Sequence, residues 1–453
     1  MSEFDGAHKW IGRHRDRGER RRLLNSRLVA WLSAVLSAAI VVGFHQTSWH
    51  RDWTIETGFF ASVSVMIIVM LTLSANGKSF RKLPVAPGKV VALVPAYNEN
   101  PYTLHACIWS LLNGTIVPDA IHVVDDGSVF PVTTFEHPRV FWHRTANQGK
   151  RAAQIYGLRH QLDADFVLTV DSDSIVDKYA LEEILRAMSA PNVQAVTGTC
   201  LVRNRSENLI TRLTDLEFVS GNFVARRARS ALGAVAPTSG PLSLYRAAVV
   251  IDNAEDYLTS GTYGDDRRLT HYSLLRGRVV VCDTAIVEME MPSTIRSLYR
   301  QRVRWCKGYM KYLPWELANL SGAALVLRMW NTVLIMIMPF VFVTAFVVIP
   351  VTTHKIYWIA WLYWCLLLYA STLTYAIGRP WLSRRQRWLT WLIGTPFLIV
   401  LQLLILRPAL FHAGLTVRDE SWGTRDVEGS DSAQAPPRAG ANRLTEALPS
   451  SIG

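Results

Sequence analysis

Cysteine is scarce in this 453-residue sequence, and its five cysteines do not share the C-x-x-C spacing of a zinc site. Because their number is odd, a disulfide framework is not indicated either, and reduced thiols suit a cytoplasmic domain. The sequence also has no internal repeat, and its N-terminal arginines are not followed by a short apolar core with a small-residue cleavage site. We therefore expect neither a zinc site nor disulfides, and no removed signal peptide.

Charge is absent from five long apolar stretches that lie toward the two ends of the chain. They are residues 28–44, 57–75, 329–351, 356–378 and 388–406. A helix that crosses the bilayer core needs about 17 to 25 apolar residues. The stretches predict an integral membrane protein with two transmembrane helices in 28–75 and a C-terminal transmembrane region in 329–417.

Acidic residues number 36 against 48 lysines and arginines, and the resulting net charge of +12 would suggest nucleic acid in a soluble protein. Here the position of the charge matters more than its total. Residues 1–27 contain Lys9 and seven arginines against four acids, and a second basic cluster lies in 379–387. Basic loops stay on the cytoplasmic side of a membrane, so we place the N-terminus and the central segment in the cytoplasm. We expect a multi-pass plasma-membrane protein that does not bind nucleic acid.

The central segment, from about residue 88 to residue 313, alternates short β-branched runs with segments of helical periodicity. The runs are 90–94, 120–124 and 165–170, and the helical segments are 103–112 and 149–161. This alternation is typical of an α/β domain with a mostly parallel sheet. Two further segments, 208–229 and 293–313, place basic residues between apolar ones and are predicted to be amphipathic helices on the membrane surface.

Each predicted strand is followed by a polar cluster: Pro95–Glu99, Asp125–Ser128 and Asp171–Asp173. Parallel α/β sheets bind ligands beyond the carboxyl ends of their strands, so three clusters on one rim predict a binding site. Asp171 and Asp173 suit a hard divalent cation, Mg²⁺ or Mn²⁺, that shares its shell with phosphates. The alternative is a solvated loop with a helix cap.

These clusters belong to an ordered set of motifs. VPAYNE (94–99), VVDDGS (123–128), NQGKRAA (147–153) and the D-x-D of 171–173 resemble the nucleotide-sugar half of inverting family-2 glycosyltransferases. GDDRRLT (264–270) and QRVRW (301–305) resemble motifs of processive membrane synthases. R-N-R (203–205), LITRLTD (209–215), SGPLS (239–243) and SWGTR (421–425) are similar to the hyaluronan synthases, and chitin-oligosaccharide synthases share most of this set.

The resemblance implies an α/β GT-A glycosyltransferase domain, with a mixed and mostly parallel sheet, inserted between transmembrane helices. The expected parts are a basic cytoplasmic N-terminus (1–27), two transmembrane helices (28–75), the GT-A domain (88–290), interface helices with the Q-x-x-R-W motif (291–325), the C-terminal transmembrane region (329–417) and a tail (418–453) that is disordered after its W-G-T-R motif.

The resemblance also implies a site. The UDP-sugar would be bound by Tyr97, Glu99, Asp125, Asp126, Lys150, Asp171, Gln301, Arg304, Trp422 and Arg425. The acceptor would be bound by Ser239, Gly240, Pro241 and Trp305. The metal, Mg²⁺ or Mn²⁺, would be held by Asp173 and Asp171, with Asp173 preferred as the direct ligand. Asp266 would be the general base, with Asp265 beside it, since adjacent residues at a helix start face different ways.

A structural alternative stands beside several of these roles. They are a core tyrosine at Tyr97, a solvated lysine at Lys150, membrane-interface anchors at Arg304 and Trp305, and acids favoured by a helix dipole at Asp265 and Asp266.

The implied function is a processive transferase that draws on UDP-GlcNAc and UDP-GlcA and moves the growing polysaccharide through the lipid bilayer. The alternatives are a single-sugar β-glycan synthase of chitin-like type and a non-catalytic membrane scaffold. Arg267, Arg268, Arg302 and Arg304 are expected to surround the site, where they would tolerate the carboxylate of a uronic acid or simply match the diphosphate.

Two features depart from the family pattern. Thr238 stands where related synthases often have cysteine. Five spans would also place the tail outside, whereas relatives keep the W-G-T-R segment in the cytoplasm. We expect Pro396, Arg407 and Pro408 to break the last apolar region into a pair of segments that returns the chain.

Overall fold

The computed structural model describes residues 26–48, 55–261, 263–354, 358–379 and 382–418. The basic N-terminus up to residue 25 and the tail from residue 419, with Trp422 and Arg425, lie outside the described residues.

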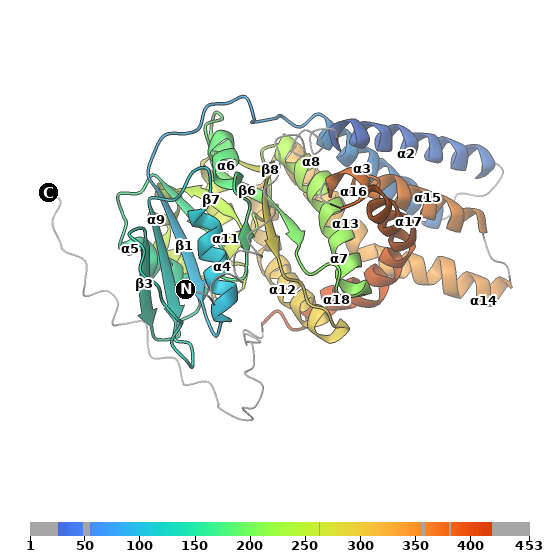
Figure 1. Cartoon of the computed structure of the whole chain (residues 1–453). Helices are drawn as coiled ribbons and strands as arrows, with labels where there is room; N and C mark the ends of the chain where they lie inside the picture. Colours follow the sequence, from blue (N-terminus) through green and yellow to red (C-terminus); the bar gives the residue numbers. More distant parts are fainter. Residues whose placement is uncertain (1–25, 49–54, 262, 355–357, 380–381, 419–453) are drawn as a thin grey trace. The chain divides into compact units, whose positions relative to one another are not determined.

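A single eight-stranded sheet forms the centre of the α/β part (Figure 1), in the order β3-β2-β1-β4-β7-β6-β8-β5. The strands are β1 Val90–Ala96, β2 Ala120–Asp126, β3 Val140–Thr145, β4 Phe166–Thr169, β5 Ile175–Val176, β6 Val193–Val202, β7 Ser243–Arg246 and β8 Arg278–Met289. The pairs β3/β2, β2/β1, β1/β4 and β6/β8 are parallel, and the other three are antiparallel. The prediction of a mixed, mostly parallel sheet is confirmed.

Helices cover both faces of this sheet because its central strands are apolar on both faces. Along β1, Val90, Ala92 and Val94 join one core, whereas Val91 and Leu93 join the other. The first core is closed by α4 Pro101–Leu112 and α6 Ala180–Met188; the second by α5 Lys150–Arg159, α9 Ala247–Ile251, α10 Ala254–Thr259 and α11 Asp265–Arg276. The predicted helices at 103–112 and 149–161 correspond to α4 and α5.

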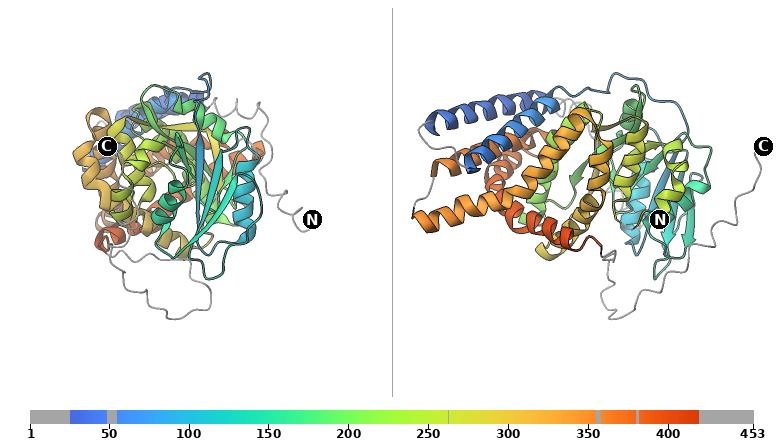
Figure 2. Two further views of the ribbon diagram at one scale, coloured as in Figure 1. Left: turned by 90° about the vertical axis from the view of Figure 1, so that its left-hand side faces the viewer. Right: turned by 180° about the vertical axis from the view of Figure 1, so that it is seen from behind.

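The two predicted amphipathic segments are helical and lie between the sheet and the long apolar helices (Figures 1 and 2). The first is built from α7 Leu209–Ser220, η2 Gly221–Arg226 and α8 Arg227–Ala231, and the second is α12 Ile295–Asn319. A capping box between Asn208 and Thr211 starts α7, and the Thr294 side chain caps α12. Leu216 and Leu298 share an apolar cluster with Leu398 of the last long helix.

Among the described residues, four helices are long and apolar enough to cross a membrane. They are α2 Ser26–Ser48, α3 Ile55–Ala75, the continuous stretch of α13 Gly322–Val343, η3 Thr344–Val348 and α14 Ile349–Thr353, and that of α17 Arg384–Leu401, η4 Gln402–Leu406 and α18 Arg407–Leu415. These helices confirm four of the five predicted spans as long apolar helices.

Within the fifth predicted span, 356–378, the described residues form two helices separated by a turn, so this span stays a prediction. Helix α15 Trp358–Thr372 is 15 residues long, and a turn separates it from α16 Tyr375–Gly378. The Tyr375 hydroxyl and the Arg379 guanidinium, which follow this turn, contact the carboxylate of Asp215.

The expected break of the last apolar helix at Pro396 and Pro408 was wrong, since the chain is helical from residue 384 to residue 415. A proline inside a helix removes one backbone hydrogen bond and leaves the carbonyl four residues earlier without its donor. Here the hydroxyl of Tyr369, on α15, donates to that carbonyl, Leu392 O, at 2.6 Å. Pro408 lies inside the same continuous helix, directly after the π-helical stretch η4.

Candidate active site

The three predicted polar clusters do meet at one rim of the sheet. Parallel pairing of β1 with β2 and β4 places their carboxyl ends side by side. The backbone N–H of Asn98 donates to Ser128 Oγ at 2.9 Å, which ties the first cluster to the second. Ser172 Oγ donates to Glu99 Oε2 at 2.7 Å, which ties the third to the first. Tyr97, just past β1, is half-buried at this rim.

Asp125 and Asp126, at the end of β2, are buried and hold the backbone around them. Asp125 accepts from Ser128 N at 2.9 Å and pairs with Arg144 at 3.2 Å. Asp126 accepts from the N–H groups of Gln148 and Gly149 at 2.9 and 2.8 Å, which fixes the start of α5. Burial raises the pKa of Asp126 in spite of these two hydrogen bonds.

Gly127, which follows the two acids, has φ +73°, and a Cβ there would lie 2.5 Å from Asn147 N. Only glycine fits this turn.

Lys150 is the centre of the site. Its Nζ lies 2.7 Å from Asp171 Oδ1, at the end of β4, and 2.7 Å from Asp265 Oδ2, at the start of α11. Burial alone would lower the pKa of Lys150, but the two carboxylates raise it well above its ordinary value. This bridge brings together residues for which the sequence predicted separate roles, and the solvated alternative for Lys150 is wrong.

The neighbouring acids of α11 differ in their electrostatics. Burial alone would raise the pKa of Asp265, but Lys150 and Arg151 outweigh it and hold this pKa below its ordinary value. Burial and the charge of Asp265 raise the pKa of Asp266 to about 6. One carboxyl is thus kept ionised while its neighbour titrates near neutrality, a separation typical of acid and base groups in active sites.

The S-G-P-L-S segment lies against the same cluster. A Cβ on Gly240 would stand 2.8 Å from Asp171 Oδ2 and 3.3 Å from Lys150 Nζ, so glycine lets the backbone approach the acids. Ser239 is buried, and its hydroxyl is 2.7 Å from Thr197 Oγ1, while Pro241 is half-buried. The hydroxyl of Thr238 lies 2.7 Å from that of Tyr245 and donates to Asp266 O at 3.2 Å.

The Q-x-x-R-W residues lie on α12. Gln301 Oε1 is buried and has no hydrogen-bond partner in the described part of the chain, while its Nε2 lies 3.8 Å from Met291 Sδ. Arg304 is half-buried, and the Trp305 ring is 40% exposed. The Arg302 guanidinium lies 4.8 Å from the centroid of that ring.

The expected basic surroundings are largely neutralised by acids of the chain itself. Arg267 pairs with the buried Glu316, Arg268 pairs with Asp256, and Arg302 lies 2.7 Å from Glu217. Whether these three arginines face the donor stays a prediction, as does the role of Arg304, the candidate that the Q-x-x-R-W motif supplies.

Sequence reasoning missed Arg151, which organises the loop before Asp265. Its guanidinium donates to Tyr257 O at 3.1 Å, to Tyr263 O at 2.8 Å and to Tyr312 Oη at 3.1 Å. The only signal in the sequence was its place beside Lys150 in the NQGKRAA motif, where an arginine suggests a phosphate contact rather than a buried one.

The acids of the rim fit a divalent cation that a diphosphate also ligates. The Cys107 thiol lies beside these acids, 3.4 Å from Asp171 O, and burial and the charges of Asp173, Asp171 and Glu99 raise its pKa. Among the described residues no group of three His, Cys, Asp or Glu side chains could hold a metal by itself. Mg²⁺ and Mn²⁺ are commonly held by one or two carboxylates plus substrate phosphates, which is the donor set available here.

A parallel-centred α/β sheet with acids at the ends of β1, β2 and β4 defines a GT-A type glycosyltransferase domain. The family model described as "Glycosyltransferase like family 2" matches residues 87–308. An N-acetylglucosaminyltransferase of Azorhizobium caulinodans is 32% identical over 279 residues, which cover 54% of this chain and 70% of that protein. The chain belongs to the family-2 glycosyltransferases.

Among its relatives is the hyaluronan synthase of Streptococcus pyogenes serotype M1, which is 36% identical over 263 residues, or 54% of this chain. The match spans 62% of the length of that synthase. A solved structure, the mannosyltransferase PcManGT from Pyrobaculum calidifontis in complex with GDP-Man and Mn²⁺, is 16% identical, with a TM-score of 0.49 over 82% of this chain and 100% of that one.

Proposed function

We propose that this protein is a processive, inverting, metal-dependent membrane glycosyltransferase of hyaluronan synthase type. It uses UDP-GlcNAc and UDP-GlcA as donors and passes the growing polysaccharide across the membrane. The observation that carries the proposal is the Lys150 bridge, because it joins the strand-end acids that suit a donor diphosphate to the acids of α11 that suit proton abstraction.

Each group at the rim then has a chemical task. Asp173 and Asp171 would hold the divalent cation, which would supply positive charge to the diphosphate leaving group. Asp266, whose pKa of about 6 suits a base near neutral pH, takes the proton from the acceptor hydroxyl. Lys150 keeps Asp171 and Asp265 oriented, and Asp265, held ionised, keeps the pKa of Asp266 high.

The acceptor side rests on α12 and on the S-G-P-L-S segment. The unpartnered, buried Oε1 of Gln301 is a free acceptor for a sugar hydroxyl or amide. The exposed ring of Trp305 offers a flat surface for a sugar face, and Arg304 offers a fork for a phosphate. Tyr97 and Glu99 face the nucleoside side of the rim, and Trp422 and Arg425 act from the C-terminal tail.

The four long apolar helices support attachment of this domain to a membrane, and the basic N-terminus and the basic 379–387 segment support a cytoplasmic catalytic domain. For Trp422 and Arg425 to act at the rim, the W-G-T-R segment has to lie on the same side of the membrane as the catalytic domain.

A chitin-like synthase is the second candidate, favoured by the likeness to an N-acetylglucosaminyltransferase. The two are separated by supplying purified full-length protein in lipid vesicles, with Mg²⁺ or Mn²⁺, with each donor alone and with both together. We expect long, hyaluronidase-sensitive polymer only with both donors, and hydrolysis or short oligomers from UDP-GlcNAc alone.

A long product from UDP-GlcNAc alone that resists hyaluronidase would establish the chitin-like function. If no donor is cleaved under any condition, the protein is a scaffold. The matched control is Asp266→Asn, which removes the proposed base and leaves the rim otherwise intact.

A further inference from the structure

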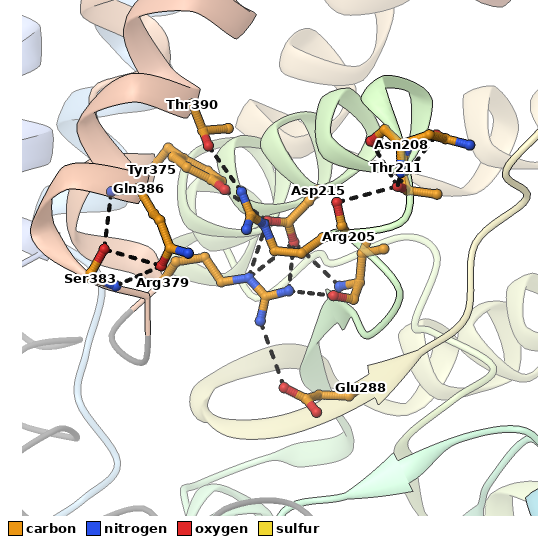
Figure 3. Close-up of polar contacts among 11 residues, drawn as sticks. Arg205, Asn208, Thr211, Asp215, Glu288, Tyr375, Arg379, Ser383, Gln386 and Thr390 are labelled. Carbon is orange, nitrogen blue, oxygen red and sulfur yellow. Dashed lines mark hydrogen bonds and ion pairs between the residues drawn. The ribbon is translucent and has the colours of Figure 1, made fainter. Parts of the chain in front are cut away.

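A buried ion-pair cluster lies outside the active site, between the catalytic domain and the long apolar helices (Figure 3). Arg379 Nε lies 3.0 and 3.1 Å from the two carboxylate oxygens of Asp215, and the Tyr375 hydroxyl donates to Asp215 Oδ2 at 2.9 Å. Arg205 Nε lies 3.3 Å from the same oxygen. The Asp215 side chain is fully buried and that of Arg379 is 2% exposed, so water does not weaken these contacts.

The cluster joins parts of the chain that are far apart in sequence. Asp215 lies on α7, whereas Tyr375 and Arg379 follow the interruption of α15. Arg205 Nη2 donates to Thr390 Oγ1 of α17 at 2.9 Å, which adds a second link to the last long helix. Arg379 also lies 3.7 Å from Glu288 in β8. The short segment between α15 and α17 is therefore anchored to the catalytic domain.

From this cluster, contacts continue to the start of α12. Arg379 donates to Val202 O at the end of β6, and the next residues form a loop, 203–208, that holds the linker 290–294. Asn204 contacts Met291 twice, through Asn204 Nδ2 to Met291 O at 2.8 Å and Met291 N to Asn204 Oδ1 at 3.0 Å. Asn208 Nδ2 donates to Ser293 O at 2.7 Å, directly before the cap of α12.

We propose that Asp215 and Arg379 are positioning residues, which set the linker 290–294 and so place Gln301, Arg304 and Trp305 of α12 at the donor rim. They touch neither donor nor acceptor. The inference rests on the proposed transferase activity and extends it, because it makes the acceptor side of the site depend on the segment between two membrane helices. A bidentate guanidinium–carboxylate contact specifies direction as well as distance, which suits this task.

The proposal predicts an uncoupling of two reactions at one rim. Donor cleavage by water needs the rim alone, whereas transfer to the polymer also needs α12. A misplacement of the reacting groups by about 1 Å lowers the rate of a reaction on the order of a hundredfold. We therefore expect Arg379→Gln and Asp215→Asn to lower the sugar transferred per UDP released by about tenfold or more, with the donor KM close to that of the wild type.

The measurement uses full-length variants in identical vesicles, with UDP release and polymer formation followed in the same reaction. The double variant Asp215→Asn with Arg379→Gln removes both charges of the pair, so neither of these two is left buried without the other, and only Arg205 loses its carboxylate partner. Arg379→Lys keeps the charge but loses the fork, and it should fall between wild type and Arg379→Gln. The matched control is Arg385→Gln, an exposed arginine on the first turn of α17, which should leave the ratio unchanged.

A variant that is merely unstable lowers both reactions by the same factor and leaves the ratio of transfer to UDP release unchanged, and that outcome would overturn the proposal. Failure of the proposed function is a separate result, since the wild-type protein itself would then release no UDP.

Discussion

Two ion-pair clusters of this chain use the same chemistry in opposite surroundings. At the rim, Lys150 is 23% exposed between Asp171, at 29%, and Asp265, at 15%. In the buried cluster, Arg379 is 2% exposed and Asp215 is fully buried. A lysine is a point charge that can exchange partners when a ligand arrives, whereas an arginine fork locks one geometry. The comparison indicates that the first cluster serves chemistry and the second serves placement.

Metal removal should give the largest difference between the two clusters, because it should affect the rim and not the buried cluster. Excess chelator, or Asp173→Asn, is expected to abolish transfer because the departing diphosphate loses its counter-charge. Neither change touches the contacts of Asp215, so the melting temperature should fall only by the amount that metal binding itself contributes, and Asp173→Asn should unfold as the wild type does in chelator. The measurement is sugar transfer together with thermal unfolding, each with and without Mg²⁺ or Mn²⁺. Full activity in excess chelator would remove the metal assignment.

The next effect in size is that of Asp266→Asn. Loss of a positioned general base should lower transfer by about a hundredfold or more, while binding of UDP is preserved. A carboxyl with a folded pKa of about 6, above its ordinary 3.8, costs stability when it is ionised. At neutral pH the neutral Asn removes that cost, so the variant should unfold at the wild-type temperature or above it.

The control for this variant is Asp265→Asn, which leaves the base but removes one of the two carboxylate partners of Lys150. If Asp265→Asn proves the more damaging to transfer, the two acids have the opposite roles. Asp215→Asn, by contrast with Asp266→Asn, should lower the melting temperature, because breaking a buried pair costs about 3 to 5 kcal/mol of folding stability.

The rim was largely predictable from the sequence, whereas the buried cluster was not. β-branched runs and the polar residues directly after them are local signals, so the amino-acid pattern by itself locates β1, β2, β4 and the acids at their ends. Arg379 and Asp215 are 164 residues apart, and neither pattern nor spacing pairs them. The same long-range contact follows the turn after α15, and no local pattern of the sequence predicts that turn.

The expected helix break failed for a related reason. Pro396 is a correct local signal for a missing hydrogen bond, but the donor that replaces it, Tyr369, comes from another helix. In the same way, the sequence shows Arg267 and Arg302 as free positive charges, although Glu316 and Glu217 neutralise them through contacts that only the fold creates.

The smallest expected effect is the pH dependence of transfer. It tests whether the charges at the rim set the pKa of Asp266 as their contacts indicate. Asp266 has to be ionised to accept a proton, and burial together with the charge of Asp265 raises its pKa to about 6. The sign follows directly: below that pKa the group is protonated and the base is lost. Transfer should therefore be constant at higher pH and about tenfold lower at pH 5 than on the plateau.

Lys150 and Arg151 hold the pKa of Asp265 low, so Asp265 stays charged throughout this range. Replacing Asp265 by Asn removes its charge and should move the midpoint of the transfer profile to lower pH. If the midpoint does not move, the charge of Asp265 does not control the pKa of Asp266, and burial alone sets it.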